Sequence, residues 1–176
     1  MPAQTCPAPI AVRGYLIGSE VLVESFQTLQ PPRDSPACLP TGVQHTVVIL
    51  AAFPSTALPA NVTASFAQAA FSGPNRSIDG YYRDASYGKA WISATVIGPI
   101  LLDADYPCTN SFPIVEAAMR AADGQVNFQN FNRVVVIAPR STTGCPVGIG
   151  GIGCWSMSTP AAGGFQASWV LVGADY

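Results

Sequence analysis

Two uninterrupted apolar runs, Thr46–Phe53 and Arg133–Ala138, constrain the fold of this chain more than any other feature. Each has the length of a strand, and a strand without polar alternation must be covered on both of its faces. Helices provide that cover in α/β proteins. The two runs therefore predict a layered α/β fold in which one sheet carries helices on both sides.

The segments between these runs read as helices and further strands. Residues 61–71 predict a helix capped by Asn61, with Val62, Phe66, Ala69 and Ala70 on one face. A second helix is expected over 77–87, capped by Ser77, ended by Gly88, and facing inward with Ile78, Tyr81, Tyr82 and Ala85. A third helix is expected over residues 112–122.

Two more strands complete the expected sheet. Lys89–Ile97 alternates between two distinct faces. Gly98-Pro99 is expected to turn the chain after it, and residues 100–102 can extend the pairing. Phe165–Val172 reads as the last strand. The order β-α-α-β-α-β-loop-β predicts a mixed, largely parallel sheet flanked by helices.

The first forty residues read differently. Ala11–Phe26 predicts two short strands broken at Gly18-Ser19, and the closely spaced prolines of residues 30–40 are typical of a linker. The expected organisation is therefore a β-hairpin-like segment with its linker over residues 1–40, and an α/β domain over residues 41–176.

Composition excludes several classes of function. The net charge is −2 and the eight basic residues are scattered singly, which gives no basic surface for nucleic acid. No apolar run approaches the roughly 18 residues that a membrane span needs. Charged residues make up 10% of the chain, a proportion that suits a secreted protein or one packed against further partners.

Five cysteines lie in loops rich in proline, glycine and serine, and no C-x-x-C spacing occurs. Loop cysteines favour disulfides and an oxidising compartment. We expect a bond between Cys6 and Cys38. We also expect Cys145 to bond to Cys154, or one of these two to pair with Cys108.

The segment Ser77–Trp91, with its Ser-Tyr-Gly-Lys turn leading into a strand, resembles part of the secreted zinc metallopeptidases of the gametolysin and immune-inhibitor-A type. The strand Arg133–Pro139 and the loop Cys145–Cys154 extend the resemblance, with Cys145 matching the first cysteine of that family's glycine-rich region. The resemblance covers residues 41–176. It implies the upper sheet subdomain of a metzincin-like fold.

The resemblance also implies extracellular, zinc-dependent proteolysis by the complete parent enzyme, acting on polypeptides. The family's His-Glu-x-x-His zinc helix does not occur here, and one histidine, His45, cannot build such a site. We therefore expect no catalytic residue, metal ligand or cofactor in this chain. Its expected part is a substrate-facing sheet edge, with Gly151, Ile152, Gly153 and Trp155 as the candidate substrate-binding residues.

Other interpretations stay open at this point. Gly148–Gly153 matches G-x-G-x-x-G, but no helix pattern follows it as dinucleotide binding requires. The glycine run can equally be a disulfide-tied loop without a ligand. The main alternative function is an extracellular structural, self-assembling or binding module, for which self-association is expected.

Overall fold

The computed structural model describes residues 10–17, 20–28, 38–74, 76–107, 111–140 and 147–175. The chain forms two compact units, one within residues 1–35 and the other within residues 36–176. In the first unit, β1 (Ile10–Ile17) and β2 (Glu20–Thr28) form an antiparallel pair. The two short strands predicted for this segment are therefore confirmed.

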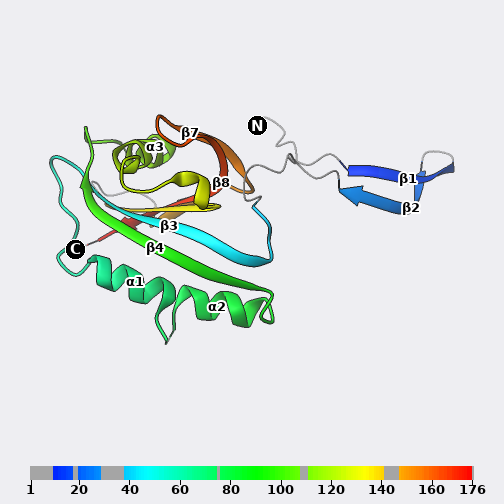
Figure 1. Cartoon of the computed structure of the whole chain (residues 1–176), viewed down its shortest axis with the longest axis horizontal. Coiled ribbons are helices and arrows are strands. Elements are labelled where there is room, and N and C mark those ends of the chain that lie inside the picture. Colours follow the sequence, from blue (N-terminus) through cyan, green and yellow to red (C-terminus); the bar gives the residue numbers. More distant parts are fainter. Residues whose placement is uncertain are drawn as a thin grey trace. The chain divides into compact units, whose positions relative to one another are not determined.

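The second unit is built on a six-stranded mixed sheet (Figure 1). Its strands are β3 (Gly42–Ala52), β4 (Ala90–Leu101), β5 (Arg133–Pro139), β6 (Gly148–Gly150), β7 (Trp155–Thr159) and β8 (Gly163–Ala174). The order is β4-β3-β5-β8-β6, and β7 pairs with β8 beside this path. The four strands β4, β3, β5 and β8 are parallel, whereas β6 and β7 run antiparallel to β8. The predicted α/β class with a largely parallel sheet is confirmed.

Helices cover both faces of this sheet, as the two apolar runs require. The helices α1 (Ala64–Ser72) and α2 (Ile78–Ala85) lie on one side, and α3 (Ser111–Ala122) lies on the other (Figure 1). A short 3-10 turn, Phe128–Asn130, precedes β5. Residues Val47 through Ala51 of β3 are completely buried.

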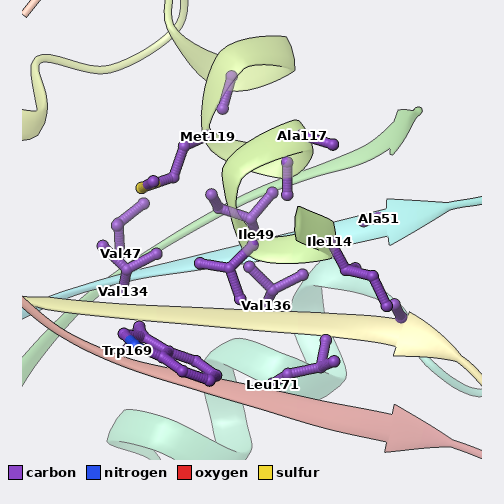
Figure 2. Close-up of a cluster of buried hydrophobic side chains, with 14 of the residues drawn as sticks. Val47, Ile49, Ala51, Ile114, Ala117, Met119, Val134, Val136, Trp169 and Leu171 are labelled. Atoms are coloured by element: carbon purple, nitrogen blue, oxygen red, sulfur yellow. The ribbon is translucent and has the colours of Figure 1, made fainter. Parts of the chain in front are cut away.

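The larger part of the core lies between the sheet and α3. Figure 2 shows Ile114 and Met119 of α3 with Val47 of β3 and Val134 and Val136 of β5. A smaller cluster on the opposite face joins the sheet to α1, and its members are Val48, Leu50, Ala67, Phe71, Ile92 and Val135. Alternate residues of the two apolar runs thus enter different clusters, which explains why neither run alternates with polar residues.

The first helix begins two residues later than the sequence suggests. Thr63, and not Asn61, is the N-cap of α1, because its Oγ1 accepts a hydrogen bond from Phe66 N at 3.1 Å. The helix buries Ala67 and Phe71, which lie four residues apart. Phe66 consequently points away from the core and is 55% exposed, so its predicted burial is wrong.

The second helix begins as predicted but ends two residues early, at Ala85, with Ser86 as its C-cap. The Ser77 hydroxyl accepts a hydrogen bond from Gly80 N at 3.1 Å, and Gly88 adopts a φ of +75° beyond the last turn. No residue of α2 is buried, however, and Tyr81 is 70% exposed. The inward orientation predicted for Tyr81 and Ala85 is therefore wrong. Ile78 and Tyr82 are 36% and 37% exposed and line a groove together with side chains of the sheet, so these two are partly covered as predicted. The helix packs along β4, the edge strand.

The strand β4 does not turn at Gly98-Pro99 but continues to Leu101. The pairing with β3 shifts between Ile49 and Ala51, which marks an irregularity in the ladder. Gly98 has a φ of +102°, and a Cβ there would lie 2.4 Å from Leu50 O. Glycine therefore lets the strand pass close to β3 at this point and resume pairing.

Candidate functional site: the open edge of the sheet

The outer edge of β4 is closed by side chains from α1 and α2. Such an edge otherwise presents unpaired N–H and C=O groups at every second residue. Three helix side chains bond to it: the Ser86 hydroxyl accepts from Ala90 N (2.8 Å), the Asp79 carboxylate accepts from Ile92 N (2.7 Å), and the Gln68 amide donates to Ala94 O (3.5 Å). This part of β4 is therefore not free to accept a further strand.

Asp79 makes two interactions at this edge. Its Oδ1 accepts from Ile92 N, while its Oδ2 lies 2.8 Å from Arg83 Nε one helical turn away. The hydrogen bond from Arg83 is the main cause that holds the pKa of Asp79 below its usual range, and Ile92 N acts in the same direction. Partial burial opposes this shift and is outweighed. The carboxylate is therefore held ionised in the folded chain.

We predict that Asp79→Asn lowers the free energy of unfolding by about 0.5–1 kcal/mol at pH 7, because the bond to Arg83 is lost while an amide oxygen still accepts from Ile92 N. Asp79→Ala should cost about 1–2 kcal/mol, since Ile92 N then loses its acceptor. The native pKa is lowered, so this stabilisation is complete above about pH 4, the range of the unfolded carboxyl, and is lost as the pH falls through the native pKa.

Urea titrations at neutral and acidic pH measure these differences. The gap between the wild type and Asp79→Asn should close in acid. Asp84→Asn is the matched control, because Asp84 is exposed on the same helix and bonds to no strand residue among those described. A gap that persists unchanged at low pH would contradict the assignment of the effect to the Asp79 carboxylate.

The opposite edge of the sheet ends in β6, which pairs with β8. Hydrogen bonds from Gly173 N to Val147 O (2.8 Å) and from Gly151 N to Trp169 O (3.1 Å) frame this antiparallel pairing. In an antiparallel ladder, the residues that bond to the partner strand recur at every second position. Ile149 lies midway between Val147 and Gly151, so its backbone groups also bond to β8.

Gly148 and Gly150 occupy the alternate positions, so their N–H and C=O groups point away from β8. Both residues are exposed, and within the described parts of the chain no strand pairs with β6 on this outer side. We call these outward-facing backbone groups of Gly148 and Gly150 the glycine edge. It presents two N–H donors and two C=O acceptors, the set that an added strand requires.

The four residues that the sequence indicated for substrate binding follow directly after the glycine edge. Gly151 packs against two indoles, and a Cβ there would lie 2.4 Å from Trp169 Nε1 and 2.5 Å from Trp155 Nε1. Ile152 is 82% exposed, and Gly153 has a φ of +81°. Gly151 and Trp155 thus support the turn, while Ile152 is the member of the four that is most open to a ligand.

An aromatic cluster anchors this turn to the body of the sheet. The rings of Phe112, Trp155 and Trp169 have centroids 5.4–5.7 Å apart. Trp155 Nε1 also donates to Ile152 O at 3.3 Å. The strand β6 itself was not predicted from the sequence. The signal available was the alternation Gly148-Ile149-Gly150, in which every second residue lacks a side chain.

The disulfide found in the structure joins Cys38 to Cys154, with Cα atoms 5.7 Å apart. The predicted bonds Cys6–Cys38 and Cys145–Cys154 are therefore wrong, as is a bond between Cys108 and Cys154. Cys6, Cys108 and Cys145 themselves lie outside the described residues. Because Cys38 is bonded, it is not a free nucleophile for the nearby His45.

The sheet order explains this pairing. Asn132 N donates to His45 O, and Ser168 N donates to Asn132 O, so the beginnings of β3 and β5 and the middle of β8 lie side by side. Trp155 in turn pairs with Ala167 of β8. Residues 116 positions apart in the sequence therefore meet at one end of the sheet. The disulfide fastens the turn that follows the glycine edge to the segment that precedes β3.

An apolar groove of about 220 Å³ crosses the sheet on the side of α2. Its lining is mainly apolar and includes Phe71, Ile78, Tyr82, Val135, Val170 and Val172. Arg133 lies at this groove, with its guanidinium donating to Gln44 Oε1 and to Leu39 O. Burial lowers the pKa of Arg133 from its ordinary value.

Two aspartates after β4 bond to nearby polar groups. Asp105 accepts hydrogen bonds from the backbone N and hydroxyl of Ser55. Asp103 accepts from the Tyr106 hydroxyl at 2.7 Å, and this bond lowers the pKa of the carboxyl. Among the described residues, no group of three or more histidine, cysteine or acidic side chains is placed to hold a metal ion.

Comparison with known proteins adds no relative: no protein-family model matches the chain, and no curated protein matches it either. No helix within the described residues is both long enough and apolar enough to cross a membrane.

Proposed function

We propose that this chain is the sheet subdomain of a secreted zinc metallopeptidase of the gametolysin and immune-inhibitor-A type, and that its glycine edge binds the extended polypeptide substrate. The observation that carries the proposal is the outward direction of the backbone groups of Gly148 and Gly150. A polypeptide added to this edge would be held in extended conformation by main-chain hydrogen bonds, which is how β-strand addition presents a peptide.

Two further features support this proposal. The edge at β4 is closed over residues 90–94 by Ser86, Asp79 and Gln68, so β6 is the better placed edge for a partner strand. The Cys38–Cys154 disulfide belongs to an oxidising compartment and restrains the turn beside β6. The zinc of the parent enzyme does not fit the described residues of this chain, so no chemical step is assigned to them.

The test uses a proline in place of one outward N–H. Gly148→Pro removes the N–H that faces an incoming strand and breaks no bond to β8. Gly148→Ala is the matched control, since it keeps that N–H and its Cβ would approach no closer than 3.8 Å to Leu171 O. We expect Gly148→Pro to weaken the binding of an alanine-rich extended peptide about threefold to tenfold, the worth of one hydrogen bond.

Binding is measured from the shift of the Gly150 amide signal in ¹⁵N spectra during peptide titration, because proline at position 148 has no N–H and the wild type and both variants keep Gly150. A peptide methylated at its backbone nitrogens should bind more weakly to the wild type for the same reason. Equal affinity of Gly148→Pro and Gly148→Ala for the unmodified peptide would overturn the proposal, provided that both variants unfold at the same denaturant concentration as the wild type.

The second candidate function is self-assembly, because an open edge also accepts a strand from another copy of the same chain. Sedimentation at increasing protein concentration separates the two functions. If the wild type associates through the glycine edge, Gly148→Pro should remain monomeric at concentrations where Gly148→Ala associates.

A further inference from the structure

We propose that the glycine edge selects polypeptide segments with large apolar side chains at two alternate positions, the positions opposite Gly148 and Gly150. This inference rests on the proposed function and specifies its substrate class. It follows from the face of the sheet on which these two glycines lie and from what surrounds them there.

The register with β8 determines that face. Gly148 lies opposite Val172 and Gly150 lies opposite Val170, whereas Ile149 lies opposite Leu171. Residues directly opposite each other place their side chains on the same face of a sheet. Leu171 belongs to the core cluster under α3, and Val172 packs against the cluster under α1. Gly148 and Gly150 therefore belong to the face that carries α1 and α2.

On that face β6 has no side chains, and the neighbouring strand is left partly uncovered. Val170 is 38% exposed, and its Cγ2 atom would lie 3.3 Å from a Cβ built at Gly150. A large side chain of the added strand, placed opposite either glycine, can extend over the backbone of β6 and contact Val170. Aromatic side chains stabilise strand glycines in this way, by covering the gap from the neighbouring strand.

The surroundings favour an apolar side chain over a charged one. The groove that begins at Val170 and Val172 continues to Val135 and Tyr82, and no carboxylate lines it among the described residues. Its one basic side chain, Arg133, already donates to Gln44 and to Leu39. A charged side chain here would lose water without gaining a partner of opposite charge.

The experiment compares host peptides Thr-X-Thr-X-Thr with X as phenylalanine, alanine, lysine or aspartate, using the full chain and the same amide signal. We expect the phenylalanine peptide to bind about fivefold more tightly than the alanine peptide, and the charged peptides to bind no better than alanine. Val170→Thr, which keeps the shape of the side chain, should reduce the preference to about twofold. Gly148→Ala should also reduce it, because its methyl group occupies part of the same space.

Ile149→Thr is the control for the opposite face and should leave the ratio of the two affinities unchanged. Equal binding of the phenylalanine and alanine peptides at the glycine edge overturns this inference and leaves the proposed function standing. If Ile149→Thr changes the preference and Val170→Thr does not, this inference is also overturned. The large side chains of the peptide would then lie on the face of the sheet that α3 covers. Absence of any shift at Gly148 and Gly150 overturns the proposed function itself.

Discussion

Replacing both Cys38 and Cys154 by serine is expected to lower the free energy of unfolding of the second unit by roughly 3–5 kcal/mol. The disulfide spans 116 positions, so its loss releases a long loop in the unfolded chain and increases the entropy of that state. The folded state also loses the link between the segment before β3 and the turn before β7. Denaturation in guanidinium chloride measures the change.

The pairing on which this prediction depends is tested separately. Peptide mapping without reduction should recover Cys38 and Cys154 in one cross-linked fragment. A loss below about 1 kcal/mol for the double variant, or a mapped bond from Cys6 to Cys38, would contradict the structure.

Phe128→Ala is expected to cost about 3–5 kcal/mol, the usual loss for a fully buried aromatic side chain. Phe128 is completely buried and stacks on Phe165 with ring centroids 5.5 Å apart. It lies in the short turn that joins α3 to β5, so its removal leaves a cavity between the helix and the sheet. Urea denaturation measures the loss. If the dependence of the unfolding free energy on urea concentration is unchanged, the substitution has altered stability alone.

Phe66→Ala is the matched control for this prediction, since it removes the same side chain from a site that is 55% exposed. Its cost should stay within about 1 kcal/mol. The sequence pattern predicted that Phe66 lies on the buried face of its helix. Equal losses of unfolding free energy for Phe66→Ala and Phe128→Ala would therefore support that pattern and contradict the structure.

Most of the fold could be predicted from local patterns. The apolar runs around Val48 and Val135 predicted buried strands because only two-sided burial satisfies them. Ser77 and Gly88 marked the ends of α2, since capping and positive φ depend on a few neighbouring residues. The inward orientation of Tyr81 was wrong, because amphipathic periodicity does not tell whether a helix meets the face or the edge of a sheet.

The candidate site was only partly visible in the sequence. The resemblance implied that Gly151, Ile152, Gly153 and Trp155 bind substrate. The outward backbone groups belong to Gly148 and Gly150 instead. The alternation Gly148-Ile149-Gly150 spans only three residues, so periodicity does not distinguish this strand from a glycine-rich loop. The β7 strand was missed as well, since its neighbours in the chain read as a loop.

The sequence by itself determined the layered α/β class, the order of the main strands and helices, and the Ser77 cap of α2, because each depends on residues close together in the chain. Tertiary structure alone decided that β8 lies next to β5 and that Cys38 meets Cys154. It also decided that, among the described residues, no strand pairs with the outer side of β6, while residues 90–94 of β4 are bonded to helix side chains. These features depend on which distant segments become neighbours, and burial of the whole sheet selects those neighbours.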